Sequence, residues 1–140
     1  EGNDWSYHYC RRQWSLADNP DLRYHDLLTF EKAMVELSRE SDILGSRDRQ
    51  VLVHNDDHVL AYEKGDLLFV FNFDATRSYE NYRIGNVKAG VYQVICSTDD
   101  DCFGGHGRVY HQGYSAGRGK NRGFSVYLPS RTGIVFRKVK

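Results

Sequence analysis

Five side chains near the start of the chain have types and spacing that could bind a ligand. They are Trp5, Tyr7, Arg11, Arg12 and Trp14. Aromatic rings stack on the apolar faces of sugar rings, and an arginine guanidinium offers several N–H donors to hydroxyl groups. The same residue types are also enriched where two protein surfaces pack together. The segment therefore has two interpretations, a wall that faces a sugar and an interface with further protein. Taken by itself, it favours the interface.

Two other groups of residues could hold a metal ion. The carboxylates of Asp99–Asp101 suit Ca²⁺, but the flanking residues lack the spaced ligands of a calcium loop, so we expect a solvated turn. His54 and His58 flank a turn that contains Asp56 and Asp57 and could ligate zinc. A third fixed ligand is not evident, and surface histidines are the better interpretation. We predict no metal site and no cofactor.

Further motifs offer no complete catalytic arrangement. The segment 104–107 is glycine-rich but lacks the spacing of a phosphate-binding turn, so we expect a loop with positive φ angles. The segment 117–123 is a short basic patch, typical of a surface loop. Ser6 and His8 are close in sequence without a supporting frame, and no convincing pair of carboxylates follows rigid strands. We therefore predict no catalytic residue and no self-sufficient catalyst.

The element around which the chain is organised is the apolar stretch 67–73. Leu67, Phe69, Phe71 and Phe73 alternate with Leu68, Val70 and Asn72. Because successive side chains of a strand point to opposite faces, this pattern predicts a central strand that is covered on both sides.

Short segments of period two on either side predict an antiparallel β-sandwich. Turn residues separate these segments, as in sandwiches of many short strands. The expected strands are Val51–His54, His58–Glu63, Ser78–Ile84, Val91–Cys96, Phe124–Leu128 and Thr132–Val139.

Two helices are expected before the sandwich. Asn3 or Asp4 could cap a short helix from Trp5 to Trp14. Asn19 and Pro20 predict the start of a helix over residues 20–40. Its apolar stripe needs a partner surface, which we expect to be protein absent from this sequence. The stripe comprises Tyr24, Leu27, Leu28, Met34, Val35 and Leu37, with Phe30 beside it. The polar segment 41–50 reads as a linker and the best internal boundary.

Composition excludes several classes of function. The 140 residues are enough for one domain with a core, and 19 basic residues balance 19 acidic ones. This balance argues against charge-driven binding of nucleic acid or a membrane surface. No apolar run is long enough to span a membrane. The three cysteines predict an intracellular protein with free thiols, a Cys96–Cys102 bridge being the minor alternative. Because the chain begins at Glu1 without Met, we expect it to be a piece of a longer protein.

A series of motifs over nearly the whole chain resembles the C-terminal part of 1,4-α-glucan (glycogen or starch) branching enzymes. Each motif is weak alone, but their order makes the resemblance specific, and it is closest to the type shared by eukaryotes and some bacteria. The motifs are Glu1–Tyr7, Cys10–Trp14, Leu22–Tyr24, Tyr62–Leu67, Phe69–Phe73, Ser78–Tyr79, Tyr82–Gly85, Phe103–Val109 and Tyr127–Thr132.

The resemblance implies a fold and a division of the chain. This family carries a sugar-binding sandwich, a central (β/α)₈ barrel and a C-terminal all-β domain. Residues 1–40 would be the end of the barrel with its last helix, and residues 41–140 the C-terminal sandwich. The helix stripe would then pack on barrel strands upstream of this sequence.

The resemblance also implies an activity. The family cleaves an α-1,4 glucan with retention and transfers the cut chain to a 6-hydroxyl, which creates an α-1,6 branch. Its catalytic carboxylates lie upstream of Glu1, so none is carried over. The five residues of the first paragraph match the loop after the last barrel strand and would position or line substrate there. Asp74 and Ala75 depart from the family's usual His-Pro, and the segments 41–50 and 110–123 are short.

Two alternatives to an enzyme segment remain open. One is a stand-alone, non-catalytic carbohydrate-binding module, whose aromatic platform would come from Tyr79, Tyr82, Tyr110 or Tyr114. The other is an interaction domain that binds no sugar and exposes an apolar patch within residues 5–37. The expected partners are α-glucan chains and the upstream barrel, and the expected location is the cytoplasm.

Overall fold

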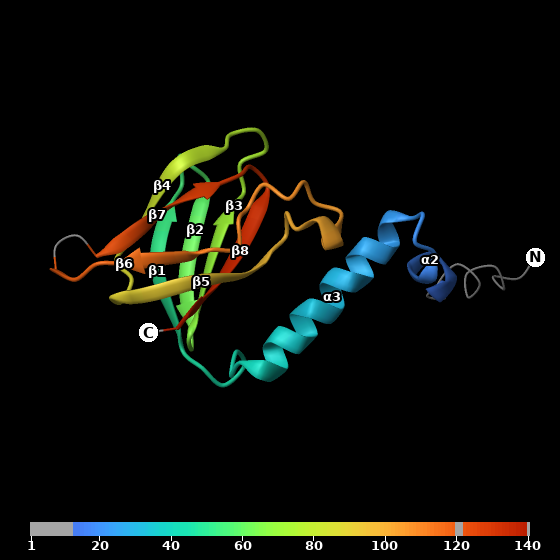
Figure 1. Ribbon diagram of the computed structural model, residues 1–140, viewed down its shortest axis with the longest axis horizontal. Helices are drawn as coiled ribbons and strands as arrows, with labels where there is room; N and C mark the ends of the chain where they lie inside the picture. The colour runs from blue at the N-terminus through green and yellow to red at the C-terminus, as the bar shows by residue number, and fades with distance from the viewer. Residues whose placement is uncertain (1–12, 120–121, 140) are drawn as a thin grey trace, which may run out of the picture.

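The computed structural model describes residues 13–119 and 122–139, which form two helices followed by a β-sandwich (Figure 1). The helices are α2 (Trp14–Asp18) and α3 (Arg23–Glu40), and a short 3₁₀ helix, η1 (Asp101–Phe103), follows the fifth strand. The strands are β1 (Asp48–His54), β2 (Val59–Lys64), β3 (Leu67–Asn72), β4 (Tyr79–Gly85), β5 (Gly90–Ser97), β6 (Gly113–Ala116), β7 (Gly123–Leu128) and β8 (Thr132–Lys138).

The strands form two antiparallel sheets. One sheet has six strands in the order β1-β2-β3-β8-β5-β6, and the other pairs β4 with β7. In the larger sheet β3 hydrogen-bonds to β2 on one side and to β8 on the other. The predicted antiparallel sandwich and the central position of residues 67–72 are therefore confirmed.

The main core lies between the two sheets. Leu68 and Val70 of β3 and Ile134 of β8 are completely buried, and the smaller sheet meets them with Val126 and Leu128 of β7. These positions alternate along their strands, so one face of each strand enters this core.

The opposite face of the six-stranded sheet is covered by α3. Leu67, Phe69 and Val135 on this face form a second buried cluster with Leu37 of the helix, and Met34 packs against its edge. Figure 1 shows α3 beside the sandwich on the side away from β4 and β7, with α2 extending beyond it. Both faces of β3 are thus covered, as its sequence predicts.

Helix α3 begins later than its sequence indicates. Asn19 and Pro20 lie in a turn, in which the Asn19 side-chain oxygen accepts a hydrogen bond from the Asp21 N–H at 3.0 Å. The backbone of Leu22 is extended, and the helix starts at Arg23. The cap geometry predicted at Asn19 is therefore used for a local turn.

Two segments expected to lack regular structure contain strands. Residues 48–50 of the predicted linker form the first part of β1 and pair with β2. Arg49 in this part forms a 2.8 Å ion pair with Glu63 of β2. The edge strand β6 lies in the segment 110–123 and pairs with β5. Edge strands need only one apolar face, and residues 48–50 and 113–116 show little apolar alternation. The sequence therefore does not predict that these residues are strands.

Asn72 at the end of β3 ties the two sheets together. Its side chain is 1% exposed, and its Nδ2 donates to the carbonyls of Leu128 at 3.3 Å, Pro129 at 3.0 Å and Arg77 at 2.9 Å. Its Oδ1 accepts from the Asp74 N–H at 3.0 Å. The residue is polar on an otherwise apolar strand because it satisfies backbone groups that are closed off from water.

We predict that Asn72→Ala lowers the free energy of unfolding by about 3 kcal/mol, because buried carbonyls lose their donor. Asn81→Ala, at an exposed position of β4, is the matched control and should change it by less than about 0.5 kcal/mol. Urea unfolding followed by fluorescence measures both. Equal, small effects of the two substitutions would show that the Asn72 hydrogen bonds do not stabilise the sandwich.

Candidate functional site

Of the five predicted substrate-binding residues, the structure describes one. Trp5, Tyr7, Arg11 and Arg12 lie outside the described residues. Trp14 is the first residue of α2, and 57% of it is exposed. The prediction for the five as a group therefore stays a prediction.

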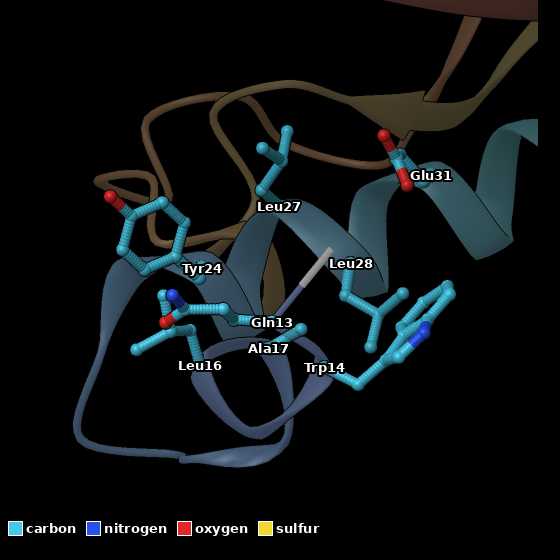
Figure 2. A pocket seen from close by; sticks show the side chains of 8 residues that line it. All are labelled: Gln13, Trp14, Leu16, Ala17, Tyr24, Leu27, Leu28 and Glu31. Carbon is cyan, nitrogen blue, oxygen red and sulfur yellow. The ribbon is translucent and has the colours of Figure 1, made fainter. Parts of the chain in front are cut away.

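Trp14 borders an apolar hollow between α2 and α3. The hollow has a volume of about 270 Å³, and the ring nitrogen Nδ1 of His25 lies 3.2 Å from the carbonyl oxygen of Ala17, which joins the two helices. Figure 2 shows the lining side chains, which are Gln13, Trp14, Leu16, Ala17, Tyr24, Leu27, Leu28 and Glu31.

The apolar surface continues along α3. Tyr24, Leu27 and Val35 are 57%, 55% and 51% exposed. Residues 24, 28, 31 and 35 are spaced by four and three, so they share one side of the helix. We call the surface formed by Trp14, Leu16, Tyr24, Leu27, Leu28 and Val35 the α2–α3 face.

The single stripe expected from the sequence is therefore divided into two. Met34 and Leu37 face the sandwich, and Phe30 packs edge-on against Phe103 at a ring-centroid distance of 5.3 Å. Tyr24, Leu27 and Val35 of the α2–α3 face are exposed and do not belong to the buried cluster on the sheet. The prediction that the stripe packs on protein absent from this sequence is wrong for Met34 and Leu37, because the six-stranded sheet is their partner.

The α2–α3 face has the chemistry of a contact surface. Its members are aromatic and aliphatic, and Glu31 is the one carboxylate among the described residues that line the hollow. Acid–base or nucleophilic catalysis needs titratable groups within hydrogen-bond reach of one another. Burial of apolar area is what this surface can contribute, at about 25 cal/mol per Å².

The histidines proposed as zinc ligands have separate partners. His54 Nδ1 lies 3.3 Å from a carboxylate oxygen of Asp57, and His58 Nδ1 lies 3.3 Å from one of Asp74. Within residues 13–119 and 122–139, no three histidine, cysteine, aspartate or glutamate side chains gather as metal ligands.

Hydrogen bonds from the backbone N–H groups of Thr76 and Arg77, and then from His58, lower the pKa of Asp74 to about 2.

The expectation of a solvated turn at Asp99–Asp101 is wrong for its first residue. Asp99 is 5% exposed and forms a 2.8 Å ion pair with Arg108. Burial raises the pKa of the Asp99 carboxyl, but hydrogen bonds from the Arg108 side chain and backbone outweigh it and leave that pKa lowered. The pair closes the loop in which Gly104 and Gly107 have the expected positive φ angles of 73° and 60°.

The four tyrosines suggested for a sugar platform lie in different surroundings. The ring planes of Tyr79 and Tyr82 make an angle of 61°. The Tyr79 hydroxyl donates to the backbone carbonyl of Asp57 and the Tyr82 hydroxyl to its carboxylate, each at 3.0 Å. Tyr114 packs against core phenylalanines, whereas Tyr110 is 76% exposed. No flat surface is shared by all four.

Two of the three cysteines lie in the described part of the chain and are free thiols. Cys96 is half-buried and Cys102 is exposed. Burial, and secondarily the negative charge of Asp100, raises the pKa of the Cys96 thiol to about 11. The thiol form of Cys96 is therefore the stable one at neutral pH.

Fold and surface together define an all-β sandwich domain with a helical arm. Residues 51–139 match the family described as "Alpha amylase, C-terminal all-beta domain", and the chain belongs to this family. The match begins within β1 and ends after β8, so it covers the sandwich and leaves α2 and α3 outside.

Curated relatives extend the similarity to the helices. The chain is 39% identical over 96% of its length to a 1,4-alpha-glucan-branching enzyme of Rhizophagus irregularis. It is 40% identical over 99% of its length to a chloroplastic/amyloplastic 1,4-alpha-glucan-branching enzyme of Oryza sativa subsp. japonica, and 40% identical over 97% to the enzyme of Eremothecium gossypii. It spans about a fifth of the length of these relatives, 20%, 19% and 20%. Neither of the two described α-helices is long and apolar enough to cross a membrane.

We predict that the 140-residue chain binds a hydrophobic dye, because the α2–α3 face is exposed to solvent. The double substitution Tyr24→Ser with Leu28→Ser should reduce dye fluorescence at least about twofold, since it removes the centre of the face. Val53→Ser on β1, where the valine is 48% exposed, is the control and should leave the signal unchanged. Equal fluorescence of all three proteins would place the dye elsewhere and contradict this prediction.

Proposed function

We propose that this chain is the C-terminal part of a 1,4-α-glucan branching enzyme. The observation that carries the proposal is identity of 39–40% over 96–99% of the chain with enzymes about five times as long, with the helices included in the match. The parent enzyme would cleave an α-1,4 glucan with retention and transfer the cut chain to a 6-hydroxyl, which forms an α-1,6 branch.

In this proposal the chain has two parts. Residues 1–40 are the end of the catalytic (β/α)₈ barrel, with α3 as its last helix, and residues 41–140 are the C-terminal all-β domain. The division of the α3 side chains into two groups supports this arrangement, because a helix that joins two domains needs an apolar contact with each.

The α2–α3 face is then the surface that packs on the upstream barrel. A leucine or valine that becomes fully buried stabilises such a contact by about 1.5–3 kcal/mol. Trp5, Tyr7, Arg11, Arg12 and Trp14 would lie where this contact meets the active-site end of the barrel, and they line or position the α-glucan there. Trp14 is 57% exposed, which fits a side chain that neighbouring protein or substrate covers in the parent enzyme.

The chemistry belongs to the upstream part of the enzyme. No catalytic residue, metal or cofactor is assigned to this chain, and its partners are α-glucan chains and the barrel of the same polypeptide, with neither nucleic acid nor membrane involved. Free thiols support a cytoplasmic location. A stand-alone carbohydrate-binding module is not favoured, because the relatives that match both helices and sandwich are branching enzymes.

We predict that the isolated 140-residue chain forms no α-1,6 linkages in amylose, whereas the longer polypeptide that contains it does. Proton NMR of the treated glucan measures the α-1,6 anomeric signal directly. The matched control is the longer polypeptide cut before Glu1 and assayed as a mixture of its two pieces. Branches made by the isolated chain, or a longer polypeptide that makes none, would contradict the proposed function.

A further inference from the structure

A second hollow lies on the outer face of the six-stranded sheet, beyond the end of α3's contact with it. Its volume is about 420 Å³, and it is separate from the α2–α3 face, with which it shares no lining residue. Its lining residues are Phe71, Asn72, Phe73, Thr98, Arg131, Thr132 and Gly133.

One wall of this hollow is the end of a row of parallel aromatic rings. Phe69, Tyr62, Phe71 and Phe73 follow one another with ring-centroid distances of 5.0, 6.0 and 5.6 Å and interplanar angles of 14°, 19° and 10°. Phe69 is buried beside α3, whereas Phe73 at the other end is 64% exposed. The row therefore fixes the orientation of Phe73 while leaving much of its ring open to a ligand.

The floor of the hollow depends on a glycine. Gly133 of β8 pairs with Phe71, and a Cβ atom at this position would lie 3.0 Å from the Phe71 ring. Any other residue would crowd the aromatic wall. Because Gly133, the second residue of β8, has no side chain, the sheet surface leaves room for a ligand beside Phe71.

Polar groups border the aromatic wall. Arg131 has a positive φ of 54°, and its Nε donates to the Ala75 carbonyl at 2.9 Å, which holds the side chain in place. Within the described residues its two terminal guanidinium nitrogens make no hydrogen bond or ion pair. Thr98 accepts a hydrogen bond from the Gly133 N–H at 2.9 Å, and its exposed hydroxyl retains a proton to donate.

An exposed aromatic ring beside fixed hydrogen-bond donors matches the chemistry of a sugar. The C–H face of a pyranose ring packs on the aromatic ring, and its hydroxyls accept from the guanidinium and the threonine. Carboxylates are absent from the described lining, so nothing there competes for the arginine. A free anion would use the arginine but would leave the aromatic wall without a role.

We propose that this hollow is a non-catalytic binding site for a glucose unit of an α-1,4 glucan. The pyranose ring packs against Phe73, and Arg131 and Thr98 donate to its hydroxyls. That the sugar belongs to an α-1,4 glucan rests on the proposed function. The adjoining hollow under the start of α3, lined by Leu27, Phe30 and Phe103 among others, also includes Thr98 and offers a path for the next units of the chain.

Titration of the isotopically labelled 140-residue chain with maltoheptaose, followed by amide NMR, tests this site. We expect the amides of Thr98, Arg131 and Gly133 to shift, with Kd on the order of millimolar. Phe73→Ala should weaken binding about tenfold, because it removes the packing surface. Arg131→Lys should weaken binding by a smaller factor, because it keeps the charge but loses the planar fork.

Val53→Ala is the control, since Val53 is 48% exposed and lies outside the hollow, and it should leave the titration unchanged. The amide dispersion of each variant reports whether it has folded. Unchanged amides at about 10 mM maltoheptaose would overturn the proposal. So would shifts of the same amides caused by inorganic phosphate alone, because they would identify an anion site.

The maltoheptaose titration and the branching assay can fail independently, and each failure has its own meaning. If maltoheptaose leaves these amides unchanged while the longer polypeptide makes branches, the binding site is wrong and the proposed function stands. If the chain binds maltoheptaose through Phe73 while the longer polypeptide makes no branches, the proposed function is wrong and the site stands.

Discussion

The burial of β3 on both faces is the constraint on which the rest of the structure depends. Leu68 and Val70 need the smaller sheet on one side, and Leu67 and Phe69 need a separate cover on the other. Helix α3 supplies that cover with Met34 and Leu37. A helix in this position is held against the sandwich (Figure 1). Its exposed apolar side chains, together with those of α2, form the α2–α3 face.

The sequence predicts the part of the fold that strong alternation specifies. The strands β2, β3, β5, β7 and β8 follow the apolar period of two, and their ends agree with the structure within one residue. The sequence does not predict the edge strand β6, because this strand has only four residues and lies among glycines. Asp99 was misjudged because its partner, Arg108, is nine residues away, and sequence spacing gives no signal for such a loop-closing ion pair.

The candidate site was predictable only in outline. The sequence showed that the helix is amphipathic, but not that Met34 and Leu37 turn to the sheet while Tyr24 and Val35 turn away, because both sets fall within one wide stripe. The aromatic row that ends at Phe73 was also missed. It joins β2 to β3 through strand pairing, and the sequence alone does not give the register that places Tyr62 beside Phe69.

The size of the native polypeptide decides whether this chain is the C-terminal part of a longer enzyme. An immunoblot of the source cells with an antibody to the sandwich measures it. We predict a band about five times the 16.2 kDa of this chain, because the chain spans about a fifth of the length of its relatives. A band at 16.2 kDa alone would contradict it, since no barrel would then be present to cover the α2–α3 face or to carry out the chemistry.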